Sequence, residues 1–169
     1  MTEQRRVIVL RHAKADWPDV PDELRPLAGR GRADAAAAGR WLAEHALVPD
    51  RVICSTAVRT RQTWELVEPE LGGAPELVLE PRAYRADAGE LVELLRELPP
   101  VVRTVLLVGH RPEVQDLVLE LAGGPAGGAL EQVREKFSTA GIAVLAVPGE
   151  WGQITAGEAE LTDYAVPRG

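Results

Sequence analysis

The chain has 169 residues, which suits one domain with a sizeable core. Hydrophobic residues make up 46% of the chain and charged residues 27%, and no apolar run approaches the length of a bilayer span, so we expect no membrane partner. The formal net charge of -7 argues against a dedicated nucleic-acid binder, which needs a basic face for the phosphate backbone.

The amino-terminal stretch and the cysteine content favour the cytoplasm. The first residues, MTEQRRVIVLRH, lack the longer apolar region and the small-residue cleavage site of a secretory signal. Cys54 is the single cysteine, so no internal disulfide can form, as is usual in a reducing compartment. We expect one cytoplasmic domain over residues 1–169, with a core over about residues 5–156 and a polar carboxyl-terminal tail.

The first predicted element is a buried strand at Val7–Leu10. Four consecutive apolar residues, three of them β-branched, are typical of a strand that is covered on both faces. Arg11 and His12 follow directly, at the carboxyl end where open α/β sheets keep their ligand crevices. A solvated loop explains the pair equally well, so other residues have to decide.

The next stretch contains a loop, two helices and a strand. Asp16–Pro26 holds three prolines and four acidic residues without apolar periodicity, so it is predicted to be an ordered loop. An alanine-rich helix is predicted over Arg30–Leu47, followed by a second short buried strand at Arg51–Cys54. A further helix is predicted over Val58–Pro69.

That further helix begins with positive charge. Ser55 and Thr56 stand before it and can act as helix caps. Arg59 and Arg61 lie in its first turn, where positive charge opposes the helix dipole unless an anion is bound. An arginine beside the free N–H groups of a helix start is a suitable phosphate clamp, although pairing of both arginines with nearby acids is an equally good explanation.

The second half of the chain repeats the opening pattern. A third buried strand is predicted over Thr104–Val108, and it leads into Gly109 and His110 before a helix over Glu113–Ala122. We expect the two strand-end histidines and Arg59 to converge on one crevice. The remaining predicted elements are a short strand at Leu77–Leu79, a helix over Gly89–Leu98, a flexible connection at Gly123–Gly128, and strands at Ile142–Val147 and Gly152–Thr155.

Six short motifs surround these residues: LRHAKA at Leu10–Ala15, D-x-x-R-P-L at Asp22–Leu27, R-G at Arg30–Gly31, S-T-A-x-R-T-x-Q-T at Ser55–Thr63, V-G-H at Val108–His110 and K-F-S-T-A at Lys136–Ala140. In this order they resemble the motifs of the histidine phosphatase superfamily, with its phosphoglycerate mutase-like fold, and within it those of the short SixA-like phosphohistidine phosphatases. The resemblance implies an α/β fold of three layers, α/β/α, with a mostly parallel central sheet, in agreement with the predicted alternation of strands and helices.

The resemblance also implies roles for individual residues. His12 would be the nucleophile that becomes phosphorylated, and Arg11, Arg59 and His110 would surround the phosphoryl group as donors. Such donors suit phosphoryl transfer, because its loose transition state spreads negative charge over three equatorial oxygens. No cofactor and no metal are expected, since the sequence offers no clustered His, Asp and Glu at ligand spacing.

Three further residues are predicted to contact the substrate: Lys14, Ser55 and Arg111. Lys14 lies in the first motif, where Ala13 and Lys14 are typical of the SixA-like branch. Arg111 stands where asparagine is common in the superfamily, so it either alters the substrate contacts or adds positive charge.

The general acid is the point at which the chain departs from its ester-hydrolysing relatives. These carry a glutamate in the region that corresponds to Tyr84–Asp87, where this chain reads YRAD. Asp87, Asp16 and Glu90 are the candidate substitutes, and the alternative is that all three are ordinary solvated carboxylates. An alkoxide leaving group needs a proton far more than an imidazole does, so the missing glutamate favours a phosphoramidate such as phosphohistidine.

We therefore expect a phosphatase that works through phosphorylated His12 on a phosphorylated protein, such as a histidine phosphotransfer domain. Two alternatives stay open. One is a phosphomonoesterase that acts on a small phosphorylated metabolite, such as a sugar or nucleotide phosphate. The other is a weakly catalytic module that binds phosphorylated partners in the same crevice.

Overall fold

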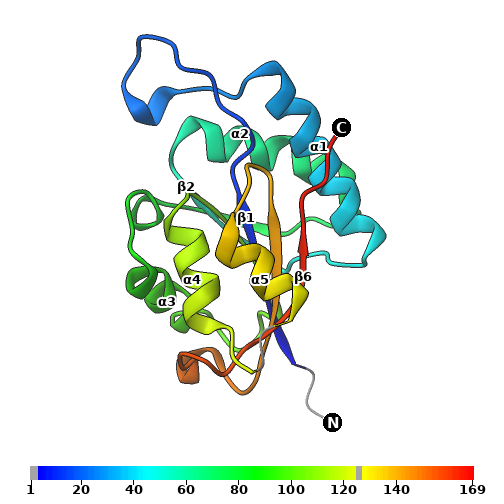
Figure 1. The fold of residues 1–169 in the computed structure, drawn as a ribbon, viewed down its shortest axis with the longest axis vertical. Helices are drawn as coiled ribbons and strands as arrows, with labels where there is room; N and C mark the ends of the chain where they lie inside the picture. The colour runs from blue at the N-terminus through cyan, green and yellow to red at the C-terminus, as the bar shows by residue number, and fades with distance from the viewer. Residues whose placement is uncertain (1–3, 125–126) are drawn as a thin grey trace.

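The computed structural model describes residues 4–124 and 127–169, and its framework is a six-stranded sheet (Figure 1). The strands are β1 Arg5–Arg11, β2 Arg51–Ser55, β3 Glu76–Glu80, β4 Thr104–Gly109, β5 Ile142–Val147 and β6 Glu160–Ala165. Their order across the sheet is β3-β2-β4-β1-β5-β6. The first four strands in this order run parallel, whereas β5 is antiparallel to both of its neighbours.

Helices and short 3-10 turns connect the strands. The α-helices of the described residues are α1 Gly29–Glu44, α2 Val58–Val67, α3 Ala88–Arg96, α4 Glu113–Leu121 and α5 Gly128–Glu135. The 3-10 turns are η1 Asp22–Leu24, η2 Glu68–Glu70, η3 Pro81–Ala83 and η4 Trp151–Gln153. Within the part of the chain that the structure describes, no helix has the length and apolar character needed to cross a bilayer.

Alternate side chains of the central strands pack into two separate hydrophobic clusters, one on each face of the sheet. Val7 and Val9 of β1 pack into a cluster with side chains of α3, α4 and α5. Ile8 and Leu10 point to the opposite face and pack with side chains of α1 and α2. All four side chains are completely buried, as the continuous apolar run predicts. The fold is therefore the expected three-layer α/β/α sandwich around a mostly parallel sheet.

The carboxyl-terminal part differs from the predictions. The segment Gly152–Thr155 is no strand, because residues 151–153 form η4, whose Trp151 is buried and donates its indole N–H to the Val102 carbonyl at 2.7 Å. Helix α5 lies where the sequence predicts no element. In the predicted glycine-rich connection, residues 125 and 126 lie outside the described residues.

The prediction of a polar tail was also wrong. Strand β6 pairs antiparallel with β5, and the backbone N–H of Gly169 donates to Asp34 at 3.1 Å. β6 is an edge strand whose side chains are half-buried or exposed, so it lacks the continuous apolar run that marks the central strands. Its position in the sheet comes from pairing with β5 and from the packing of Leu161 and Tyr164 against the core.

The sheet order brings together the carboxyl ends of β1, β2 and β4, where the next loops begin. β4 lies between β1 and β2, and Arg11 of β1 stands opposite Gly109 of β4. Parallel neighbours end at the same edge of a sheet. His12, Ser55 and His110 therefore lie at the same edge.

Candidate active site

His12 is held by the backbone at the carboxyl end of β1. Its N–H donates to the Gly109 carbonyl of β4 at 3.0 Å, and its ring Nδ1 lies 2.6 Å from the Ala13 carbonyl oxygen. Because a carbonyl oxygen only accepts hydrogen bonds, Nδ1 carries the ring proton and Nε2 keeps its lone pair. This tautomer is the one that a nucleophilic Nε2 requires.

The surroundings keep the His12 ring neutral. The side chain is only 8% exposed, and burial lowers its pKa to about 3. The hydrogen bond to Ala13 opposes this shift, whereas His110, Arg11 and Arg59 reinforce it through charge repulsion. At neutral pH the imidazole is thus uncharged, with a free electron pair on Nε2.

The turn that carries His12 is fixed by α1 and α2. The N–H of Ala13 donates to the Thr63 hydroxyl of α2 at 3.0 Å, and the Lys14 carbonyl accepts from Ala28 at 2.9 Å. A Cβ atom on Gly31 would lie 2.1 Å from the Lys14 carbonyl oxygen. The first turn of α1 can approach this closely only with glycine, which explains the R-G segment.

Arg11 and Arg59 each keep one edge of the guanidinium group free of hydrogen-bond partners among the described residues. Arg11 donates from Nη1 to the Phe137 carbonyl at 2.9 Å, and Arg59 donates from Nη1 and Nη2 to the Asp22 carbonyl and carboxylate at 2.7 and 3.0 Å. Among the described residues, the buried Nε atoms of both arginines have no hydrogen-bond partner. An edge with an unpaired Nε is suited to a bidentate contact with phosphoryl oxygens.

His110 is oriented by a buried serine. Its Nε2 lies 2.8 Å from the Ser55 hydroxyl, and that hydroxyl also accepts from the Ala57 N–H at 3.3 Å. Among the described residues the buried Ser55 hydroxyl has no acceptor for its hydrogen other than Nε2, so it donates to Nε2, and the ring proton of the neutral His110 lies on Nδ1. That Nδ1 is buried without a partner in the described chain, so it is a third open donor.

His110 and His12 face one another across the site, with ring centroids 5.5 Å apart. Burial lowers the pKa of His110 to about 4, and Arg59 and Arg11 contribute to the shift while Asp22 opposes it. His110 is thus neutral at neutral pH as long as no anion is bound. A phosphoryl group beside it would raise its pKa and strengthen its role as a donor.

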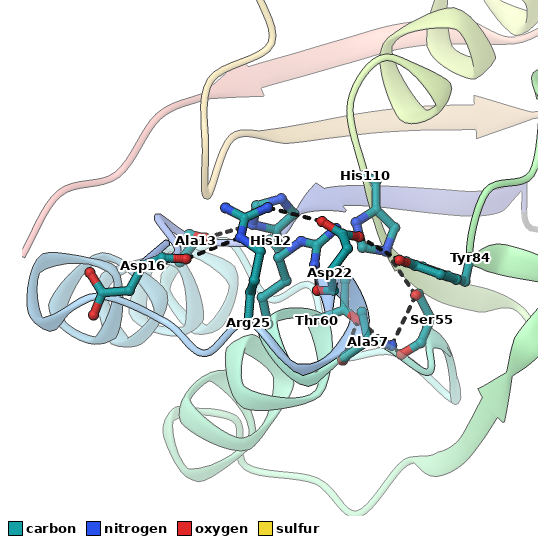
Figure 2. Close-up of polar contacts among 11 residues, drawn as sticks. His12, Ala13, Asp16, Asp22, Arg25, Ser55, Ala57, Thr60, Tyr84 and His110 are labelled. Atoms are coloured by element: carbon teal, nitrogen blue, oxygen red, sulfur yellow. Dashed lines mark hydrogen bonds and ion pairs between the residues drawn. The ribbon is translucent and has the colours of Figure 1, made fainter. Parts of the chain in front are cut away.

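Asp22 and Tyr84 belong to the site although the sequence analysis assigned neither a role. Oδ2 of Asp22 accepts from Arg59 and from the Tyr84 hydroxyl, and Oδ1 accepts from Arg25 at 3.2 Å. The Tyr84 ring lies edge-on to His110, with centroids 5.5 Å apart, and Figure 2 shows these side chains grouped around Asp22. The hydrogen bond from Tyr84, followed by those from the two arginines, lowers the pKa of Asp22 far below its usual range.

One feature of the sequence could have identified Asp22 as a site residue: it stands three residues before Arg25, and the pair encloses the short turn η1. Tyr84 offers no comparable signal, because it contacts Asp22 across 62 positions of the chain.

The predicted substrate contacts occupy different places. Lys14 and Arg111 are exposed, and they lie two residues after His12 and one residue after His110 in the chain, so their contact with a substrate stays a prediction. Arg111 is near enough to Arg11 to help lower its pKa, although burial is the larger cause. Ser55 is completely buried, and its hydroxyl bonds His110 and the Ala57 N–H, so it supports a donor instead of facing a substrate.

The three candidate general acids have other partners or point elsewhere. Asp87 accepts from the Glu90 N–H at 2.8 Å, and Glu90 accepts from the Asp87 N–H at 3.2 Å, so the pair caps α3. Figure 2 shows the carboxylate of Asp16 pointing away from His12 and His110. A role as general acid stays a prediction for all three. Within residues 4–124 and 127–169, no three His, Cys, Asp or Glu side chains form a group that could hold a metal ion.

The arrangement is a neutral nucleophile beside three open donors. The free Nε2 of His12 can attack an electrophilic centre, while Arg11, Arg59 and His110 can bind negative oxygens around that centre. Tetrahedral phosphoryl groups offer such a centre with three peripheral oxygens, which matches the number of open donors.

Comparisons with known proteins point the same way. The family model of the histidine phosphatase superfamily (branch 1) matches residues 7–100. An uncharacterized Mycobacterium tuberculosis protein, Rv1276c, is 41% identical over 162 residues, which are 94% of this chain and 100% of that protein. Phosphohistidine phosphatase SixA of Escherichia coli is 30% identical over 125 residues, covering 70% of this chain and 75% of SixA. Among solved structures, a Nakamurella multipartitia protein assigned to the SixA phosphohistidine phosphatases superimposes with a TM-score of 0.88 at 32% identity, over 98% of both chains.

Proposed function

The chain belongs to the SixA-like branch of the histidine phosphatase superfamily and is a phosphatase, and on this premise we propose that it dephosphorylates phosphohistidine on proteins through a phosphorylated His12. The observation that carries the proposal is the state of His12. Its Nδ1 proton is donated to the Ala13 carbonyl at 2.6 Å, and its pKa is lowered to about 3, so Nε2 is free to attack at neutral pH.

The reaction proceeds in two displacements. First, Nε2 of His12 forms a bond to phosphorus while the bond from phosphorus to the leaving group breaks and its electron pair stays with the leaving group. Arg11, Arg59 and His110 bind the phosphoryl oxygens, whose negative charge replaces the missing partners of their open N–H groups. Water then attacks the phosphorus of phosphorylated His12 while the P–N bond breaks and its electron pair returns to Nε2. The oxygen of the water leaves in inorganic phosphate, and the surplus proton passes to solvent.

A phosphohistidine substrate suits this site because nucleophile and leaving group are then the same kind of nitrogen. The first displacement exchanges one P–N bond for another, so it needs less help from a general acid than release of an alkoxide. The candidate acids agree with this, since Asp87 and Glu90 cap α3. Relatives that are named phosphohistidine phosphatases further support the substrate class. We infer a histidine phosphotransfer domain as the form in which the substrate arrives.

The test is turnover of a phosphorylated histidine phosphotransfer domain, compared with p-nitrophenyl phosphate and a panel of phosphomonoesters. We expect a strong preference for the phosphorylated domain, together with an acid-labile, alkali-stable phosphoryl group on the enzyme during turnover. His12→Ala should abolish both. The matched control is His45→Ala, because His45 is an exposed histidine stacked on Trp41 at the end of α1.

Wild-type turnover in His12→Ala would overturn the covalent mechanism. Faster turnover of esters than of the phosphorylated domain would select the small-molecule phosphomonoesterase instead. Tight binding of the phosphorylated domain without release of phosphate would select a binding module.

A further inference from the structure

Asp22 places a negative charge at the entrance of a site built to bind an anion. Its side chain is 41% exposed, whereas His12 and His110 are each 8% exposed. In Figure 2 its carboxylate lies among His12, His110 and Tyr84. The carboxylate thus accepts from Tyr84, is near enough to His110 to affect its pKa, and faces solvent at the same time.

The carboxylate is ionised at neutral pH. The charged and titratable groups that face it are Arg25 from its own loop, Arg59 from α2, Tyr84 from the segment after η3, and His110 from the end of β4. Two of these are permanent cations, and all three of the hydrogen bonds that reach the carboxylate stabilise its charged form.

Phosphate binding does not by itself require the negative charge of the Asp22 carboxylate. Arg59 is already held by the backbone carbonyl of Asp22, which accepts from Nη1 at 2.7 Å. The carboxylate adds a second contact to Nη2 at 3.0 Å, and it also repels a phosphoryl dianion. A neutral side chain could keep the first contact without the repulsion, so the charge must be useful for another part of the substrate.

We propose that Asp22 is a specificity-determining residue that selects substrates whose leaving group carries a protonated nitrogen. This inference rests on the proposed function and names the feature of the substrate that the site recognises. In a protonated phosphohistidine ring, one nitrogen bears the phosphoryl group and the other bears a hydrogen, so the ring is positively charged. The exposed part of the Asp22 carboxylate stabilises that ring by charge and by accepting its N–H.

The transfer step then balances without a general acid. As Nε2 of His12 bonds to phosphorus, the P–N bond of the substrate breaks and its electron pair neutralises the ring. The imidazole leaves uncharged, with its hydrogen still on the other nitrogen. An ester leaving group brings no positive charge, so Asp22 offers an ester only repulsion.

The test compares two substrates, 3-phosphohistidine and p-nitrophenyl phosphate, in the wild type and in Asp22→Asn. We expect the ratio of their kcat/KM values to fall about tenfold in Asp22→Asn, the factor that corresponds to about 1.4 kcal/mol. A displaced Arg59 slows both substrates together, so this common loss cancels in the ratio. Asp19→Asn is the matched control, because it removes the same charge from an exposed position of the same loop.

A second variant and a pH profile keep the test decisive. Tyr84→Phe removes one donor to Asp22 but keeps the charge, so the ratio should stay close to the wild-type value. The negative charge raises the pKa of the bound phosphohistidine ring. The alkaline limb of the single-turnover rate should therefore move about one pH unit lower in Asp22→Asn.

The outcomes separate this inference from the function on which it rests. An equal loss on both substrates in Asp22→Asn, with an unmoved alkaline limb, would overturn it and leave Asp22 as a residue that only positions Arg59. Absence of phosphorylated His12 in the wild type would instead overturn the proposed function.

Discussion

Acidification should lower the free energy of unfolding of the wild-type protein more than that of a variant that lacks the His12 imidazole. The pKa of His12 is lowered to about 3 in the folded chain, from 6.5 in an unperturbed histidine. As the pH falls through 6.5, the unfolded chain takes up a proton on this ring and the folded chain does not. The stability that is present above pH 6.5 is therefore lost progressively as the pH falls toward 3.

The magnitude follows from this difference in pKa. Between pH 7 and pH 5 the unfolded ring becomes almost fully protonated while the folded ring stays neutral, which lowers the free energy of unfolding by about 2 kcal/mol. For a chain of this length, that loss corresponds to about 4 to 8 °C in Tm.

The variant His12→Asn isolates this contribution. Its amide N–H₂ can donate to the Ala13 carbonyl as Nδ1 of His12 does, but it does not titrate. Urea unfolding at pH 7 and pH 5 should show that the wild type loses about 2 kcal/mol more than the variant. Carboxylates and His110, whose pKa is also lowered, contribute to both proteins and cancel. Equal losses in the two proteins would show that His12 is not held neutral by burial, and the argument for a free Nε2 would fail with it.

Three further predictions follow from the contacts of the site. Ser55→Ala leaves Nε2 of His110 buried without a partner, so the free energy of unfolding measured by urea titration should fall by about 1 to 3 kcal/mol. The kcat value should fall with little change in KM. An unchanged kcat would mean that Ser55 does not orient His110. Arg59→Lys loses the forked guanidinium, so the rate of His12 phosphorylation should fall on the order of 100-fold in quench experiments, whereas a near-wild-type rate would show that charge alone suffices. Gly31→Ala places a Cβ 2.1 Å from the Lys14 carbonyl oxygen, so urea unfolding should show a loss of about 1 to 3 kcal/mol, and full stability would show that α1 can move away.

Some residues of the candidate site could be found from local sequence patterns, whereas others are placed only by contacts between distant parts of the chain. His12 and His110 could be found in the sequence because each follows a continuous apolar run, and such runs mark central parallel strands whose carboxyl ends meet. Tyr84 could not be found this way, because its contact with Asp22 joins two loops and leaves no periodicity in either. Ser55 was predicted to contact the substrate, but it is completely buried and its hydrogen bond to His110 shows that it supports a donor instead.

The sequence by itself determined the central strands, the helices α1 to α4 and the two histidines at the strand ends, because burial against the sheet imposes a local pattern of apolar residues. The tertiary structure alone decided the place of β6, a half-exposed edge strand that is held by hydrogen bonds with β5 and by the packing of Leu161 and Tyr164 against the core. It also decided which nitrogen of His12 is free and which donors stay open, since these depend on backbone carbonyls and burial that distant segments supply.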